Sequence, residues 1–402
     1  MRMLHEFIKK ECTLLDYELL REETGGKPKR TVSYGRWAGI VGVLDTLWAY
    51  GEHLYRKERI DHPFRALRSG ACYDLEKCEY RGLDVARSQV SVIGREMREN
   101  GLPFPVKIGI AGFSGEVGHG ALEVLTAWGL PVVEVDADQF LNPEFRDSYV
   151  FEPDRIYLIK LHYHHLYRPK AGSDISDSEI RTTLKSGKGF LLESNLDKYF
   201  LSLTIFLNCI SWNKECPRLL TNAFLKKAFD LRHERGLKVL PVIGDITCDP
   251  NGSIQCCRDT YPDRPVYMWI PEQSEEPILP DFDIKSVGDD FEYFDLSRDG
   301  FVLMTVTNLP CEIPRDASAQ FSRDFCKKRA DLGGKSYLEC LAEADFERSF
   351  ADCGLPPAMK DAVILYKGRF NPTNPQVLFK EICLALIETG VIRTEQVLPM
   401  LR

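Results

Sequence analysis

The sequence lacks an excess of basic residues. Its 402 residues contain 60 Asp and Glu against 52 Lys and Arg, which gives a net charge of -8 at pH 7. A protein that works mainly by binding the phosphate backbone of nucleic acids needs a basic surface, so the composition argues against that class. The stretch 271–300 alone holds ten acidic residues against Lys285 and Arg298, and it accounts for the whole net charge. We interpret this stretch as a solvated acidic insert.

Long apolar runs are also absent. The longest, Leu201–Trp212, is shorter than the ~20 residues that a membrane-spanning helix needs, and it contains Asn208. Lys9 and Lys10 interrupt the N-terminal region, which therefore has no apolar core of a secretory signal. The 13 cysteines are odd in number and lack the spacing of a disulfide framework. We therefore expect an intracellular protein, cytoplasmic or mitochondrial, with reduced thiols and no membrane partner.

What the sequence does contain is an alternation of short apolar strands with helices. This alternation predicts an α/β fold, a doubly wound parallel (Rossmann-like) sheet with a truncated second α/β substrate domain. A long helix over 34–57 precedes it, and Gly35, Gly39 and Gly42 share one side of that helix, which predicts close packing against another element. The expected strands cover residues 106–111, 131–135, 155–161, 202–209, 237–243 and 300–307. The expected domains are a remnant of a substrate domain (1–33), a dinucleotide-binding domain with the acidic insert (34–312) and a helical part that returns to the substrate domain (313–402).

The strongest local motif is a glycine-rich loop between the first of these strands and its helix. Gly112, Gly115 and Gly118 stand where glycines let a backbone approach a pyrophosphate, and the helix N-terminus that follows offers N–H groups. The spacing departs from G-x-G-x-x-G, and tight chain packing is the alternative explanation of the glycines. Asp136 ends the next strand about twenty residues on, where an acid accepts hydrogen bonds from an adenosine ribose. The pattern therefore predicts a dinucleotide site, with NAD favoured slightly over NADP because an acid repels a 2′-phosphate.

Three histidines, His162, His164 and His165, follow the strand at 155–161. His162 and His164 would share one face if the strand continued, which is compatible with metal binding. No Cys or acid stands beside them in the sequence to complete a site, so we interpret them as an ordinary polar strand end and expect no metal.

Two further groups have a structural and a functional interpretation. Asp245 and Asp249 follow a buried strand, at the edge of the sheet where doubly wound folds place ligands, although capping of a turn explains them equally well. Cys248 lies between them, and Cys256 and Cys257 follow shortly after. Because these thiols have neither C-x-x-C spacing nor an evident base, we interpret them as structural.

Motifs spread over nearly the whole chain resemble one family, lysine–ketoglutarate reductase, also called saccharopine dehydrogenase (lysine-forming). It is the reductase half of the bifunctional aminoadipic semialdehyde synthase, within the alanine dehydrogenase and transhydrogenase superfamily. The motifs that carry the resemblance are LLDYE at 14–18, YGRWAG at 34–39, the glycine loop, NCISW at 208–212, PRLLT at 217–221, GDITCD at 244–249, GSI at 252–254, NLP at 308–310, IPRDAS at 313–318 and MKDAV at 359–363.

The resemblance implies NAD(P)-dependent interconversion of lysine plus 2-oxoglutarate and saccharopine. The ε-amine of lysine attacks the keto carbon, water leaves, and NAD or NADP exchanges a hydride with the resulting imine. The substrate residues implied are Arg30, Tyr34, Asp245, Ile246 and Thr247, with Glu18 as an electrostatic helper. The cofactor residues implied are Lys29, Gly112, Gly115, Glu116, Gly118, Asp136, Ser211, Gly244, Val306, Thr307, Asn308 and Leu309.

Two departures from the family pattern leave two hypotheses open. The family's N-terminal lobe, with its catalytic Lys and His, has no counterpart here, and His5 lies in a later helix and cannot replace the family's His. Thr307 stands where the family has Asp. The chain is then either a reductase whose missing lobe a partner chain or domain supplies, or a non-catalytic dinucleotide-binding or regulatory relative.

Overall fold

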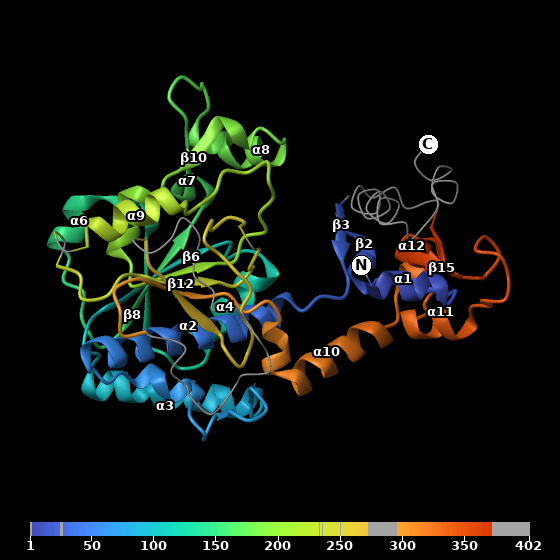
Figure 1. The fold of residues 1–402 in the computed structure, drawn as a ribbon, viewed down its shortest axis with the longest axis horizontal. Coiled ribbons are helices and arrows are strands. Elements are labelled where there is room, and N and C mark those ends of the chain that lie inside the picture. Colours follow the sequence, from blue (N-terminus) through green and yellow to red (C-terminus); the bar gives the residue numbers. More distant parts are fainter. Residues whose placement is uncertain are drawn as a thin grey trace. The chain divides into compact units, whose positions relative to one another are not determined.

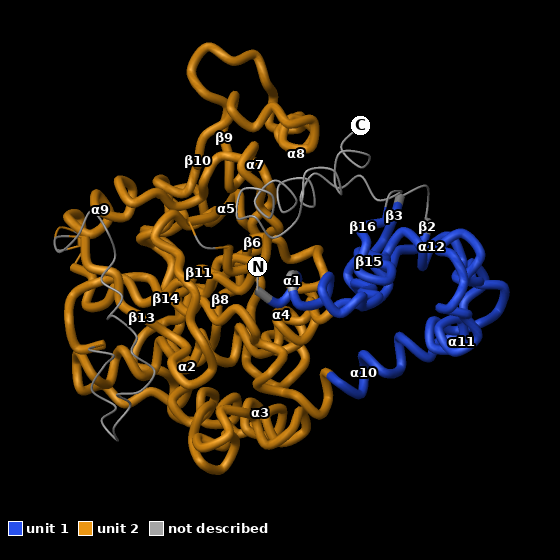
Figure 2. The backbone as a smooth tube through the Cα atoms, turned by 45° about the vertical axis from the view of Figure 1, so that its right-hand side comes forward, with its two compact units in different colours: residues 1–33, 318–402 blue, residues 34–317 orange. Residues whose placement is uncertain are grey.

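The computed structural model describes residues 2–24, 27–232, 234, 236–249, 251–271 and 296–371. The chain forms two compact units, residues 34–317 and residues 1–33 with 318–402 (Figure 2). Most of the acidic insert, residues 272–295, and the predicted C-terminal helical segment beyond residue 371 lie outside the described residues.

The larger unit is built on a seven-stranded sheet in the order β13-β14-β12-β11-β6-β8-β7. All neighbouring pairs are parallel except β13 with β14. The predicted doubly wound α/β sheet is therefore confirmed, and the antiparallel edge strand β13 was not predicted. The strands are β6 (Val106–Ala111), β7 (Val132–Val135), β8 (Ile156–Leu161), β11 (Ile205–Asn208), β12 (Val242–Asp245), β13 (Val266–Trp269) and β14 (Phe301–Met304).

Helices cover both faces of this sheet. Helices α2 (Gly35–Glu58) and α3 (Leu83–Asn100) lie on one side, and α6 (Pro143–Ser148) and α9 (Asn222–Asp230) lie on the other (Figure 1). Successive residues of a strand point to opposite faces. Ile156 and Leu158 accordingly join the core under α2, and Tyr157 and Ile159 join the core on the other side. Burial on both faces explains why the strands appear in the sequence as continuous apolar runs.

The strand order departs from the simplest doubly wound arrangement. The third strand along the chain, β8, lies between β6 and β7, with Ala111 opposite Leu161 and Val135 opposite Ile159. Strands β7 and β8 lie on one side of β6, and the next strand of the sheet, β11, lies on the other side. The direction in which strands are added therefore reverses at β6, and the crevice that this reversal creates lies between β6 and β11. His162, and not Asp136, therefore directly follows the strand beside the one that leads into the glycine loop.

Helix α2 packs against α4 (Glu116–Ala127) with almost no space between the backbones. A Cβ added at Gly39 would stand 1.9 Å from the carbonyl oxygen of Val117, and one added at Gly120 would stand 2.0 Å from that of Arg36. Only glycine fits at such an approach. The close packing that the glycine pattern of 34–57 predicts is confirmed, and the partner element is the helix that follows the glycine loop.

Replacement of Gly39 with alanine is therefore expected to lower the free energy of unfolding by about 1–3 kcal/mol, in spite of alanine's better helix propensity. Urea unfolding followed by circular dichroism measures the change. Gly70→Ala is the matched control, because a Cβ at Gly70 meets nothing within 4 Å. Equal stability of both variants would contradict the close approach of the two helices.

The smaller unit contains strands as well as helices. Here β15 (Val363–Tyr366) pairs with β1 (Leu14–Leu15) and with β16 (Arg369–Phe370), and β2 (Arg21–Thr24) forms a hairpin with β3 (Lys27–Arg30). The part 313–402, which we expect to be helical, also contains the strands β15 and β16, because the apolar run there pairs with the N-terminal segment. Among the described residues of this part, the α-helices are α10 (Pro314–Cys326), α11 (Tyr337–Glu343) and α12 (Pro357–Lys360).

Candidate functional site

The glycine loop joins β6 to α4 and lies beside the end of β11. Gly112 has a φ of +75°, and a Cβ there would stand 2.5 Å from the backbone of Cys209. The Cys209 N–H donates to the Ala111 carbonyl, 3.0 Å away, so β11 accompanies β6 up to this turn. Gly112 therefore turns the chain at a place where a side chain would collide with the backbone that follows the neighbouring strand.

The start of α4 is shaped by the other two glycines of the loop. At Gly118 an added Cβ would lie 2.3 Å from the Gly112 carbonyl oxygen, which fixes the first turn of the helix directly against the loop. Gly115 occupies the N-cap position without a side-chain cap, and it has ordinary extended backbone angles. Its added Cβ would meet only the Gly112 oxygen, at 3.5 Å. Glu116, the first helical residue, is exposed. The helix N-terminus is thus exposed, with a backbone that a phosphate group can approach.

Polar side chains gather at the ends of β11 and β12, next to this loop. The Asn208 Nδ2 group donates to the Asp245 Oδ1 atom (2.7 Å) and to the Ser253 hydroxyl (2.8 Å), and all three side chains are buried. Among the described residues, the Asp245 Oδ2 atom has no hydrogen-bond partner. Burial raises the pKa of Asp245 to about 6. A carboxyl group with such a pKa exchanges a proton readily near neutral pH, which is the property that acid–base catalysis requires. The role of Asn208 was missed because the residue lies in an apolar strand run.

Asp245→Asn is expected to change how stability depends on pH. The pKa of an unfolded Asp is about 3.9. Between this pH and about pH 6, the carboxyl group of Asp245 is therefore protonated in the folded chain but ionised in the unfolded chain. The resulting stabilisation is complete below the lower value and is lost as the pH rises through the upper one. The stability difference between wild type and variant should change by about 3 kcal/mol across this window. Urea unfolding at several pH values measures it, and a constant difference would contradict the raised pKa.

The residues next to Asp245 divide between the core and the crevice. A Cβ added at Gly244 would stand 2.3 Å from the Thr46 Oγ1 atom of α2. A glycine at this position therefore leaves the space in which α2 packs against the strand. Ile246 is buried and its side chain fills the space at Gly42. Thr247 is half-buried, and its hydroxyl lies 3.4 Å from the Asp245 Oδ1 atom. Of these neighbours, Thr247 offers the polar atom closest to the carboxylate.

The remaining predicted residues of this unit follow β11 and β14 or begin α2. Ser211 is exposed after β11. Beyond β14, Val306 and Leu309 are buried, Thr307 is exposed and Asn308 is half-buried. Since β14, β12, β11 and β6 are consecutive in the sheet, their carboxyl ends form one edge, to which all of these residues belong. Tyr34 is half-buried at the N-cap position of α2, and burial raises its pKa.

In the smaller unit, Glu18, Lys29 and Arg30 lie on or beside the β2–β3 hairpin. The Arg30 Nη2 atom is 3.2 Å from the Glu18 Oε2 atom, and both side chains are about half exposed (46% and 50%). Lys29 is exposed opposite Glu22 in the strand register. The predicted carboxylate-binding Arg30 and the predicted electrostatic helper Glu18 are therefore ion-paired with each other.

The histidines of 162–165 do not continue the strand, so the expectation that His162 and His164 share a strand face is wrong. Strand β8 ends at Leu161, His162 caps the short helix α7 (Tyr163–Leu166), and the buried His165 reaches the Asp138 Oδ1 atom at 3.0 Å. The acid that is missing beside them in the sequence is supplied by the fold, because Asp138 lies 27 residues from His165 in the chain but next to it in space. They border a pocket of about 490 Å³ lined by Phe113, Glu134, Val135, Asp136, Ala137, Asp138, Lys160, His162, His164 and His165.

Asp136, the predicted ribose-binding acid, lies on the wall of this pocket. Its carboxylate caps α5 (Ala137–Leu141) by accepting from the Gln139 N–H at 3.0 Å. Phe113 of the glycine loop lines the same pocket and packs edge-on against His162, with ring centroids 4.9 Å apart. The glycine loop and Asp136 thus lie on the wall of one pocket, together with the three histidines.

The cysteines near Asp245 are packed side chains. The Cys248 thiol donates to the Thr305 carbonyl at 2.8 Å and lies 3.8 Å from the Cys257 sulfur. Burial raises the pKa of Cys256 to about 12. The thiol of Cys256 is therefore protonated at neutral pH and unsuited to nucleophilic attack.

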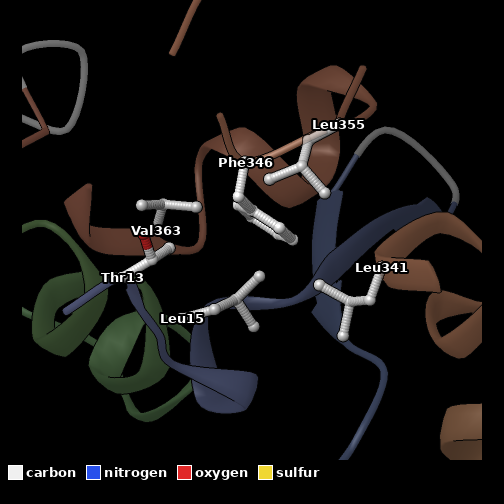
Figure 3. Close-up of a pocket in the computed structure, with 6 residues that line it drawn as sticks. All are labelled: Thr13, Leu15, Leu341, Phe346, Leu355 and Val363. Carbon is white, nitrogen blue, oxygen red and sulfur yellow. The ribbon is translucent and has the colours of Figure 1, made fainter. Parts of the chain in front are cut away.

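A second pocket, of about 270 Å³, lies within the smaller unit (Figure 3). Among the residues that the structure describes, no charged side chain lines it, and none of the predicted site residues belongs to it. The six side chains that surround it are Thr13, Leu15, Leu341, Phe346, Leu355 and Val363. Within the described ranges, no helix has the length and apolar character that crossing a bilayer requires.

The sheet order and the glycine loop define an α/β protein of the Rossmann-like class. No family model matches the chain. The chain is similar to the alpha-aminoadipic semialdehyde synthase of Arabidopsis thaliana, with 27% identity over 384 residues. It is also similar to the mitochondrial enzymes of that name from Mus musculus (26% over 388 residues) and Bos taurus (25% over 389 residues).

These alignments cover 92% of this chain but only 31% of the Arabidopsis protein and 36% of each mammalian one. The chain therefore spans about a third of the length of the curated relatives it matches. The resemblance to the aminoadipic semialdehyde synthase family that the sequence motifs indicate is confirmed.

Proposed function

We propose that this chain is an NAD(P)-binding oxidoreductase of lysine metabolism that corresponds to the reductase part of aminoadipic semialdehyde synthase. The observation that carries the proposal is the glycine loop. It lies where the winding of the sheet reverses, with the helix N-terminus and the buried Asp245 on the same edge. Ligands of doubly wound sheets bind at this edge.

The proposed reaction joins lysine and 2-oxoglutarate to give saccharopine, or runs in reverse. A bound dinucleotide supplies or accepts the hydride. The Arg30 guanidinium would hold a substrate carboxylate through paired hydrogen bonds, and it would exchange its Glu18 partner for the substrate to do so. Asp245, with a pKa of about 6, would pass a proton to or from the condensing groups.

The proposed choice between NAD and NADP rests on the pocket that Asp136 lines. Three acids, Glu134, Asp136 and Asp138, border this pocket, and its one lysine, Lys160, is ion-paired with Glu134 at 2.7 Å. The excess of negative charge opposes a 2′-phosphate and favours NAD.

A second candidate function is a non-catalytic dinucleotide-binding or regulatory role beside a complete enzyme. Thr307 favours this alternative. It is exposed at the carboxyl end of the β14 segment, where the family pattern has a carboxylate.

Purified chain should be assayed for oxidation of NADH and NADPH that depends on both lysine and 2-oxoglutarate. Turnover that falls strongly in Arg30→Met supports the reductase. Saturable dinucleotide binding without turnover supports the regulatory alternative. Failure to bind either dinucleotide contradicts both.

A further inference from the structure

The four residues Asp138, His162, His164 and His165 form a compact group, which we call the histidine cluster. The His164 and His165 rings lie 3.9 Å apart between centroids, and the His162 ring lies 5.8 Å from that of His164. One ligand atom from each of Asp138, His164 and His165 lies within 4.8 Å of the other two. These residues come from the segments that follow β7 and β8, which are neighbours in the sheet.

Hydrogen bonds set the proton position on His165. Its Nδ1 atom accepts the backbone N–H of His162 at 3.0 Å, so in the neutral ring the proton is on Nε2. That proton is donated to the Asp138 Oδ1 atom at 3.0 Å. The buried ring (3% exposed) thereby holds in place a carboxylate that is itself 78% exposed to solvent. An exposed acid fixed in this way is already arranged to receive a cation.

The charges around the pocket favour a cation over an anion. Glu134, Asp136 and Asp138 line it against Lys160, whose charge is compensated by Glu134. A phosphate group would meet this negative excess, whereas a divalent cation would neutralise it. Imidazole nitrogens together with a single carboxylate suit zinc and the late transition metals, and the hard ions magnesium and calcium prefer sites made of oxygen atoms alone.

We propose that Asp138, His164 and His165 bind a divalent transition metal of the zinc type. Ligand atoms around one such ion lie about 3–3.5 Å apart, given metal–ligand distances of about 2.0–2.2 Å. Small rotations of the partly exposed Asp138 and His164 side chains close the remaining gap. Coordination through the Nε2 atom of His165 moves the ring proton to Nδ1. Nδ1 then no longer accepts the His162 N–H, so this bond breaks when the metal binds. Three protein ligands leave a fourth position open to water or another small ligand.

This proposal does not depend on the proposed function, because it needs neither a dinucleotide nor lysine. It is tested on the full chain, stripped of metal, by titration with Co²⁺ followed by visible absorption and with Zn²⁺ followed by calorimetry. We expect about one equivalent of metal to bind per chain. The visible absorption should be that of Co²⁺ coordinated by nitrogen and oxygen atoms. The variants His164→Ala and Asp138→Ala should each weaken binding at least about 10-fold, because each removes a direct ligand.

His119→Ala is the matched control, because His119 is exposed on α4 and lies outside the cluster. Its metal affinity should equal that of the wild type. Circular dichroism of each variant verifies the fold, and both Asp138 and His164 are accessible enough for substitution without loss of the core. Absence of stoichiometric binding overturns the proposal. So does unchanged affinity in both cluster variants, or a sulfur-to-cobalt charge-transfer band that assigns the metal to cysteines.

Discussion

Replacement of Gly115 with aspartate is expected to abolish dinucleotide binding without destabilising the chain. Gly115 is the N-cap of α4 and has extended backbone angles (φ −90°, ψ 172°), which any residue adopts. The nearest atom to an added Cβ is the Gly112 oxygen at 3.5 Å, an ordinary contact. Aspartate is among the best N-cap residues, so the variant should be as stable as the wild type or slightly more stable.

The same carboxylate would stand where a pyrophosphate must approach the helix N-terminus. Two unit charges about 4 Å apart near a protein surface repel by about 4 kcal/mol, which corresponds to roughly a 1,000-fold loss of affinity. Calorimetric titration with NADH and thermal unfolding measure the two effects on the same samples. Gly115→Ser caps the helix without the charge, and it should lose much less affinity. Equal NADH affinity in Gly115→Asp and wild type would place the dinucleotide elsewhere.

Replacement of Arg68 with methionine is expected to cause a large loss of stability. Arg68 ends the 3₁₀ helix η2 (Pro63–Arg68), is almost fully buried and lies between two carboxyl side chains, Asp45 and Glu312, that have no exposure at all. Its Nη2 atom is 3.1 Å from the Glu312 Oε2 atom, and its Nε atom is 3.9 Å from the Asp45 Oδ1 atom. Removing the cation leaves buried negative charge uncompensated, which costs about 3–5 kcal/mol.

Chemical denaturation measures this loss, with Arg81→Met as the control. The Arg81 guanidinium is about half exposed and lies 3.8 Å from Asp74, so its removal should cost less than about 1 kcal/mol. A loss at Arg68 no larger than at Arg81 would contradict the structural role of the buried network. Because Glu312 ends the turn η9 (Leu309–Glu312), the network also holds the segment in which the predicted cofactor residues 306–309 end.

Glu312 should give the stability of the chain a dependence on pH. Burial and the neighbouring Asp45 raise its pKa well above the ordinary value for Glu. The folded chain therefore keeps a proton that the unfolded chain loses near pH ~4.3. This stabilisation is complete at acidic pH and is lost as the pH rises through the raised pKa. Glu312→Gln mimics the protonated side chain and should remove that part of the pH dependence. An unchanged pH profile of urea unfolding would contradict it.

The local parts of the fold could be predicted from the sequence because their signals lie within a few residues. Strand β6 is an apolar run that ends in glycines, and α4 begins at those glycines, so the loop and its role as a helix start follow directly. The close packing of α2 was predictable for a similar reason, since Gly35, Gly39 and Gly42 form a helix face that has no side chains. The element that packs against α2 was not predictable, because nothing in the sequence around the glycines of α4 indicates which helix they contact.

The order of the strands could not be predicted. Nothing in the sequence of β7 or β8 states which one lies beside β6, yet that order places His162 next to the glycine loop. Asp138 illustrates the same limit. It is 27 residues from His165 in the sequence, and only the parallel pairing of β7 with β8 brings the two side chains together. Asn208 was hidden by its apolar neighbours, although it is the residue that binds Asp245.

Titration of the folded chain with NADH and, separately, with NADPH, each beside Gly115→Asp, tests the dinucleotide site most directly. We expect saturable binding of about one dinucleotide per chain, tighter for NADH, that is lost in the variant while its thermal stability is retained. A folded wild-type chain that binds neither dinucleotide, or a variant that binds as tightly as the wild type, would contradict the central claim that the glycine loop is a dinucleotide site.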